Sequence, residues 1–180
     1  MERLDQNVAD AIRILAQSVQ DIGLRSCIDE ACPTRLTRNQ FLILNLLNAN
    51  GAFPIGEIAG VLDISSPAAS KNVDRLESLG LVRRLRRAAD RRVHDVELLP
   101  AGAAIVARFV AVATARNEAL LARFSEGEKT QLYDLLRRVV LMTLENEKNI
   151  DAICLQCWSR RGQECILRDR PDGCLHDRNH

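Results

Sequence analysis

Hydrophobic residues recur every three or four positions at the start of the chain. Between residues 4 and 22 they form one stripe, made of Leu4, Val8, Ala11, Ile12, Leu15, Ala16, Val19 and Ile22. This spacing predicts an amphipathic helix with one apolar face. We expect the helix to stop at Gly23 and to be followed by a loop that contains Cys27, Cys32 and Pro33.

A second helix is predicted from about residue 38 to residue 49. Thr37 stands three residues before Gln40, just ahead of the apolar run FLILNLLNA. This spacing is a capping box, in which each side chain accepts a hydrogen bond from a free backbone amide of the other residue. The apolar run predicts a buried helix, and the letters NGAFP that follow are typical of a turn.

Two short helices joined by a tight turn come next. The segment IGEIAGVL, residues 55–62, predicts the first helix, and Ser66 and Pro67 predict the start of the second. Serine is a common helix N-cap, and proline suits the first helical position, where its missing amide would have no partner anyway. We expect the second helix to end at Gly80.

A β-hairpin is predicted after these helices. Residues 81–87, LVRRLRR, and residues 93–99, VHDVELL, place their apolar residues as half-buried strands do. The polar segment AADRR between them predicts the tip of the hairpin.

Two long helices close the regular part of the chain. The first is predicted from Pro100 to about Phe124, and the second begins at another capping box, Ser125 and Glu128, and continues to about Ile150. Their apolar surface exceeds what a lone helix pair buries, so we expect both to pack against a partner. The fold class predicted is mainly α, with one hairpin.

Composition narrows the class of protein. Hydrophobic residues make up 47% of the 180-residue chain and charged residues 27%, as in soluble globular proteins. Charged residues interrupt the N-terminus where a secretory signal needs an apolar core, and no stretch approaches the roughly 18 apolar residues of a spanning helix. We therefore expect a cytoplasmic protein without membrane contact. Its six cysteines then favour metal or redox chemistry over structural disulfides.

The order of helix, turn, helix and hairpin is that of a winged helix-turn-helix, whose second helix enters the DNA major groove. The net charge of +1 conceals six arginines within residues 83–92. Arginine runs also occur on solvated faces, and similar helix pairs occur in folds that bind no DNA, but the combination favours double-stranded DNA as a partner. The candidate contacts are Ser65, Ser66, Ser70, Lys71, Asn72, Arg75, Arg84, Arg86, Arg91 and Arg92.

The segments IGEIAGVLDISSPAASKNVDRLESLGLVRR and DRRVHDVELLPAG make the chain similar to the MarR-type transcriptional regulators over about residues 4–148. The resemblance implies a homodimer held by its long terminal helices and a palindromic operator, usually bound as a repressor. It also implies that Asp90 orients Arg92 for the minor groove. Leu99-Pro100 departs from the Leu-Thr usual before the next helix. Cys27 does not match the cysteine of peroxide-sensing members, so that mechanism is not carried over.

The last part of the chain lies outside this resemblance. Its four cysteines are spaced C-x2-C-x7-C-x8-C, at Cys154, Cys157, Cys165 and Cys174. A Cys-x-x-Cys pair places two thiolates near one metal centre, and wide uneven spacing of the other two favours an iron–sulfur cluster of the 4Fe-4S type. Structural zinc is the alternative, and redox disulfides or unligated thiols are the third. Cys27 and Cys32 are interpreted as buried thiols.

These observations predict a MarR-like dimeric winged-helix domain at residues 1–150, with a DNA-binding lobe at about 37–99, and a metal-binding extension at 151–180. The predicted function is a transcriptional regulator, a repressor by analogy, whose DNA affinity depends on the cluster. The alternative is a repressor with structural zinc and a small-molecule effector bound between the dimer helices and the lobe. No glycine-rich nucleotide loop, Ser/His/Asp constellation or paired carboxylates indicate an enzyme.

Overall fold

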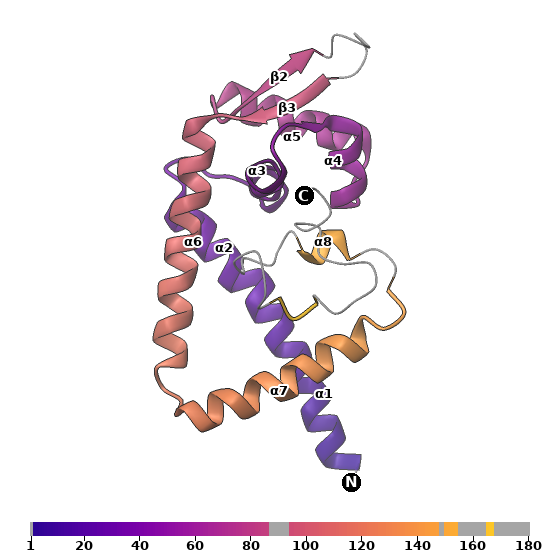
Figure 1. The fold of residues 1–180 in the computed structure, drawn as a ribbon, viewed down its shortest axis with the longest axis vertical. Coiled ribbons are helices and arrows are strands. Elements are labelled where there is room, and N and C mark those ends of the chain that lie inside the picture. Colours follow the sequence, from indigo (N-terminus) through magenta and orange to yellow (C-terminus); the bar gives the residue numbers. More distant parts are fainter. Residues whose placement is uncertain (1, 87–93, 148–149, 155–164, 168–180) are drawn as a thin grey trace.

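The computed structural model describes residues 2–86, 94–147, 150–154 and 165–167. Its elements are α1 (Glu2–Gln17), η1 (Ser18–Leu24), α2 (Arg25–Ala31), α3 (Arg38–Asn50), β1 (Phe53–Pro54), α4 (Ile55–Leu62), α5 (Ser66–Ser78), β2 (Val82–Arg86), β3 (His94–Leu98), α6 (Pro100–Leu121), α7 (Glu126–Thr143) and α8 (Asp151–Cys154). Figure 1 shows a lobe of short helices and strands at one end, framed below by the α1–α2 segment, α6 and α7. The predicted mainly α winged-helix fold is confirmed. Within the described ranges, no helix is long and apolar enough to cross a lipid bilayer.

The first helical segment is longer than predicted. The helix does not stop at Gly23 but passes through the π-helical turn η1 and continues as α2. Leu24, Ile28 and Ala31 are all buried, and α2 packs against α6, so tertiary contacts outweigh the low helix propensity of glycine. Cys27 therefore lies in a helix, not in the expected loop.

Helix α3 runs through the middle of the lobe. The predicted capping box is present: the Gln40 amide donates to Thr37 Oγ1 at 3.3 Å, and the Thr37 amide donates to Gln40 Oε1 at 3.0 Å. The side chains that follow are almost all buried, because this helix is apolar on nearly every side. The rings of Phe41 and Phe109, 4.3 Å apart between centroids, connect it to α6.

Helices α4 and α5 form the predicted helix-turn-helix. The turn between them places Asp63 in the left-handed region, with φ 52°. Helix α5 begins one residue earlier than expected, because Ser65 is the N-cap and accepts a hydrogen bond from the Ala68 amide at 3.3 Å. Ser66 is thus the first helical residue, and Pro67 is the second.

The predicted hairpin is formed by β2 and β3, paired antiparallel from Val82 opposite Leu98 to Arg86 opposite His94. The sequence did not predict a third strand, β1, which pairs with β3 on the edge opposite to β2. It contains two residues, one of them Pro54, and a proline at a sheet edge gives no strand signal.

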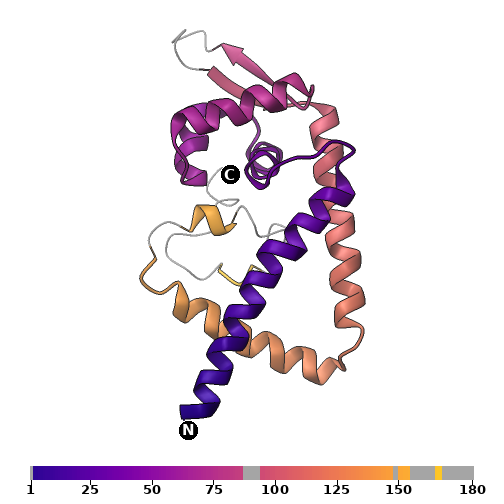
Figure 2. The same ribbon diagram turned by 180° about the vertical axis from the view of Figure 1, so that it is seen from behind.

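The two long helices begin as predicted, but the second ends early. Glu128 and Ser125 form the capping box of α7, with the Glu128 amide donating to Ser125 Oγ at 3.3 Å. The helix ends at Thr143 instead of Ile150. Turns follow, and Ile150 is fully buried. Figures 1 and 2, which view the molecule from opposite sides, both show α8 inside the frame, between the lobe and α7.

Candidate nucleic-acid interface and cysteine site

Helix α5 has a buried side and a polar outer side. Ala69, Val73 and Leu76 are fully buried in the lobe, whereas Lys71 and Arg75 are exposed. Ser65 and Ser66, at the start of the helix, are exposed as well. This division leaves a hydrogen-bonding and cationic surface on the second helix of the helix-turn-helix, the surface that reads DNA in proteins of this architecture.

Two other predicted contacts on α5 already have partners within the chain. The Asn72 side-chain amide donates to the Ala68 carbonyl at 2.9 Å, and Ser70 Oγ is 3.5 Å from a guanidinium nitrogen of Arg84. Both side chains are half-buried. A base contact by Asn72 would therefore use its second amide hydrogen or its Oδ1.

Arg84 joins strand β2 to α5, which the sequence reading did not predict. Its guanidinium lies 2.6 Å from an Asp74 carboxylate oxygen and 2.8 Å from one of Glu77. The Arg84 backbone amide also donates to Glu77 at 3.0 Å. Partial burial alone would lower the pKa of Arg84, but the hydrogen bond and charge of Asp74, with those of Glu77, raise it. Arg84 is therefore charged and paired, and the clue in the sequence was the acidic pair on the outer side of α5.

The arginines of the wing are only partly described. Arg83 pairs with Glu97 across the strands, and Arg86 lies in β2 opposite His94. The predicted contacts Asp90, Arg91 and Arg92 lie outside the described residues.

Of the four tail cysteines, Cys154 and Cys165 belong to the described part of the chain. Cys154 ends α8 and is 2% exposed, and Cys165 is half-buried. Cys165 Sγ accepts a hydrogen bond from the Leu167 amide at 3.4 Å. Cys157 and Cys174 lie outside the described residues, and within those residues no three His, Cys, Asp or Glu side chains are grouped as metal ligands.

The other two cysteines are buried, as predicted. Cys27 lies in α2 between Ser26 and Glu30, which both accept hydrogen bonds from Arg116 of α6, at 2.5 and 2.6 Å. Burial raises the pKa of the Cys32 thiol, an effect that Arg108 partly opposes. A raised pKa keeps this thiol protonated and slow to react.

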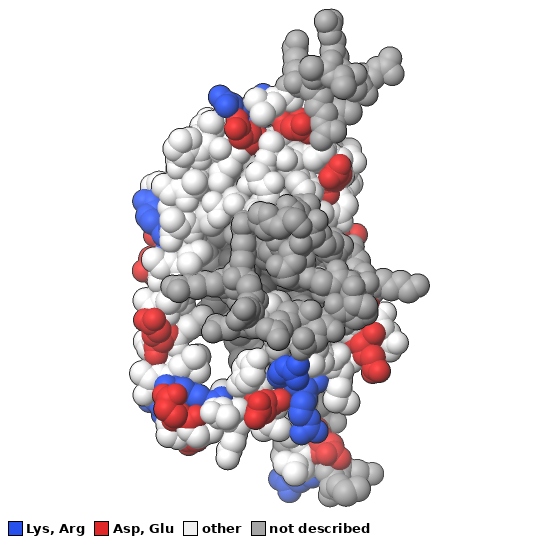
Figure 3. Space-filling view, in the orientation of Figure 1, with Lys and Arg blue, Asp and Glu red and all other residues white. Residues whose placement is uncertain are grey.

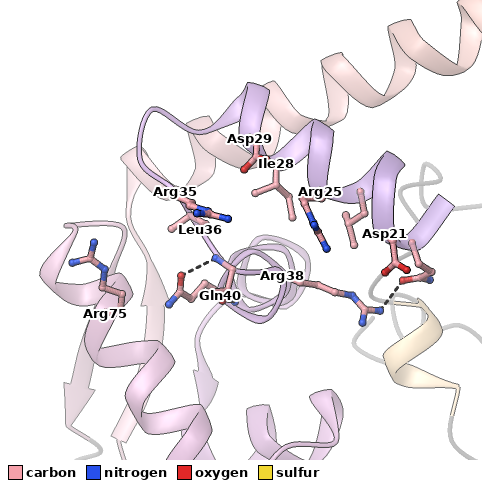
Figure 4. A pocket seen from close by; sticks show the side chains of 12 residues that line it. Asp21, Arg25, Ile28, Asp29, Arg35, Leu36, Arg38, Gln40 and Arg75 are labelled. Carbon is pink, nitrogen blue, oxygen red and sulfur yellow. Dashed lines mark hydrogen bonds between the residues drawn. The ribbon is translucent and has the colours of Figure 1, made fainter. Parts of the chain in front are cut away.

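A cavity of about 480 Å³ lies between the first helical segment, the start of α3 and α5. Figure 4 shows Arg25 and Arg35 beside the start of α3, and Arg38 extended toward η1, where it donates to Gln20 at 2.8 Å. Arg75 approaches from α5. Four guanidinium groups on its walls give the cavity a cationic character, although Asp21 and Asp29 also line it.

The arrangement of α3, α4, α5 and the β2–β3 hairpin defines a winged helix-turn-helix protein. Residues 36–94 match the model of the MarR family. The crystal structure of YusO from Bacillus subtilis has the same fold, with a TM-score of 0.67 and 23% identity over 77% of this chain and 96% of that one. The chain is therefore similar to the MarR family in sequence over residues 36–94, and it has the same fold as YusO.

Two curated relatives are similar in sequence. The transcriptional regulator PecS of Dickeya dadantii is 34% identical over 58% of this chain and 65% of its own length. The transcriptional repressor MdtR of Bacillus subtilis is 30% identical over 57% of this chain and 65% of its own length. The chain thus spans less than two thirds of either relative.

Proposed function

We propose that the protein is a sequence-specific DNA-binding transcriptional regulator and acts as a repressor. The outer surface of α5, with Ser65, Ser66, Lys71 and Arg75 exposed above a buried apolar side, carries this proposal. The similarity to PecS and MdtR supports regulation of transcription, and the similarity to the repressor MdtR supports repression.

We propose further that it works as a homodimer on a palindromic operator. Large apolar side chains are exposed along the first helical segment and α7, including Leu4, Val8, Val19, Leu132 and Leu135. On the face drawn in Figure 3, the charged side chains of described residues are scattered and of both signs, with uncharged surface between them. A twofold arrangement of α5 helices would match the twofold symmetry of a palindrome.

Operator selection from a random-sequence duplex library tests DNA binding directly. We expect one palindromic site to be enriched, and Lys71→Ala to weaken binding to it and to reduce the salt slope by about one, as loss of one phosphate contact does. The matched control is Lys129→Ala, at a half-buried lysine of α7 that pairs with Glu126, and it should leave binding unchanged. No enrichment, or equal effects of the two variants, would contradict the proposal.

We propose that an iron–sulfur cluster, held by Cys154, Cys157, Cys165 and Cys174, controls DNA affinity, with zinc as the alternative metal. The hydrogen bond from the Leu167 amide to Cys165 Sγ supports this, because amide donors stabilise a thiolate and tune cluster potentials. The burial of Cys154 among apolar side chains would shield a bound metal from water. When bound, a cluster would supply a redox-sensitive group whose loss or change in charge reports oxygen, nitric oxide or iron supply.

Purification without oxygen, followed by iron, sulfide and zinc analysis, separates these alternatives. A protein that holds a cluster is brown and absorbs at about 400 nm, whereas a zinc protein is colourless. Cys154→Ser should abolish metal binding, and Cys32→Ala, which removes a thiol far from the tail in sequence, should not. Operator affinity that is equal before and after exposure to air would exclude control by the cluster.

The arginine-lined cavity favours a second candidate function, regulation by a small anionic molecule. Arg25, Arg35 and Arg38 can form charge-assisted hydrogen bonds with a carboxylate or phosphate. A panel of aromatic carboxylates and phosphate esters, screened by thermal stabilisation, tests this function. Arg25→Ala should remove the response to any compound that stabilises the native chain.

A further inference from the structure

The cysteine-bearing segment is anchored on the DNA-binding lobe. Ile150, Cys154 and Leu167 are 0%, 2% and 5% exposed, and they belong to the same apolar core as Ile58 and Ala59 of α4. Helix α8 packs against α4 and has no comparably extensive contact with another described element. Helix α8 therefore lies against the first helix of the helix-turn-helix, and Leu167 is buried in the same core.

The short helix α8 places the anchor and the thiol on one side. The amides of Cys154 and Ile153 donate to the Ile150 carbonyl at 2.8 and 2.9 Å, which fixes this turn of the backbone. Residues four apart share a helix face, and Ile150 and Cys154 are both buried, whereas Ile153 is 41% exposed. The Cys154 thiol and the buried Ile150 therefore belong to one hydrogen-bonded turn of the backbone.

Helix α4 leads directly to the candidate DNA-reading surface. It packs against α5, and the turn at Asp63 joins the two helices. By contrast, α7 carries exposed apolar residues on the surface proposed for the dimer, and it ends at Thr143, before the segment begins. The shortest physical connection from Cys154 to α5 runs through α4.

We propose that α8, with the buried Ile150 before it, acts as an intramolecular brace on α4, so that the state of the Cys154 thiol is transmitted to α5 within one chain and not through the dimer helices. The nature of the signal rests on the metal control proposed above. Ligation of Cys154 to a metal centre shared with Cys165 would hold α8 in place against the core that also contains Leu167. Loss of that ligation would weaken the packing of α8 against α4.

Amide hydrogen exchange on the full-length protein tests the brace. The protein is purified without oxygen and compared with the same protein after treatment with an iron chelator. We expect amides of α4 to exchange about tenfold faster after the treatment, with α7 unchanged. Faster exchange in α1 and α7 with α4 unchanged would overturn the proposal, because the signal would then travel through the dimer helices.

Two isoleucine variants test the brace independently of metal binding. Ile150→Ala removes the buried anchor and should loosen α4 selectively, with α3 still protected as evidence that the lobe is folded. Ile153→Ala, on the exposed side of the same helix, should leave α4 unchanged. Equal protection of α4 in both variants would overturn the brace. If metal analysis finds no metal but Ile150→Ala alone loosens α4, the brace stands and metal control fails.

Discussion

The junction between α6 and the hairpin leaves no room for a side chain at Gly102. A Cβ atom there would lie 2.5 Å from the Leu81 carbonyl oxygen and 2.6 Å from Leu98 Cδ1. The Leu98 methyl group can rotate away, but the Leu81 carbonyl accepts a hydrogen bond from the Leu99 amide at 3.0 Å and is held in place. Gly102→Ala must therefore push the start of α6 away from the hairpin.

The size of the effect follows from two opposing terms. Overpacking a tight site destabilises a protein by about 1–3 kcal/mol, whereas exchanging glycine for alanine in a helix stabilises it by up to about 1 kcal/mol. We expect a net loss of about 1–2 kcal/mol, which lowers the melting temperature by roughly 2–8 °C in a chain of this size. Gly127 is the matched control, because it lies in the first turn of α7, where a Cβ atom would meet no other part of the protein within 4 Å. Gly127→Ala should stabilise the chain by about 0.5–1 kcal/mol.

Urea unfolding followed by circular dichroism measures both variants. All samples need one protein concentration, because the stability of the proposed dimer would depend on it. Opposite signs for the two variants are the expected result. If Gly102→Ala were as stable as Gly127→Ala, the packing at this junction would be looser than the structure describes, and the reasoning would fail.

Three further results are expected. Thr37→Ala should cost about 1 kcal/mol in urea unfolding by removing the N-cap of α3, and a change near zero would contradict the capping box. Arg84→Ala should cost about 1–2 kcal/mol because two ion pairs and their hydrogen bonds are lost, more than Arg83→Ala, whose pair with Glu97 is exposed. In alkylation at neutral pH, mapped by mass spectrometry, Cys27 and Cys32 should react only after denaturant is added. Both thiols are buried, and burial raises the pKa of Cys32. Labelling of either cysteine in the native protein would refute this expectation.

The parts of the fold that depend on contacts between residues close in sequence could be predicted. Thr37 and Ser125 identified two helix starts correctly, because each capping box is a contact between residues three apart and is therefore visible as a spacing. The hairpin was also found, since its strands are neighbours in the chain. The N-cap of α5 was misplaced by one residue, at Ser66 instead of Ser65, because two adjacent serines offer the same chemistry.

What could not be predicted depends on contacts between distant segments. Helix propensity favours a break at Gly23, but packing of α2 on α6 keeps the helix intact. The apolar pattern beyond Thr143 resembles continued helix, yet burial of Ile150 near α4 requires a turn first. Among the candidate DNA contacts, the pairing of Arg84 with Asp74 could not be read from spacing, because the strand and the helix meet only in the folded chain.

Three contacts connect the lobe internally and to its neighbours. Arg84 pairs with α5 from the wing, the Leu81 carbonyl of the hairpin packs closely against Gly102 of α6, and α4 packs between α5 and the segment that begins at Ile150. The first two lie between elements that a folded lobe always contains, so they set its shape without varying. The third involves a short helix that ends in a buried cysteine, and its packing can depend on the chemistry of that thiol. A regulator built this way would change the orientation of α5 within each protomer of the proposed dimer and leave the dimer surface intact. Loss of DNA affinity without dissociation of that dimer would therefore distinguish this route.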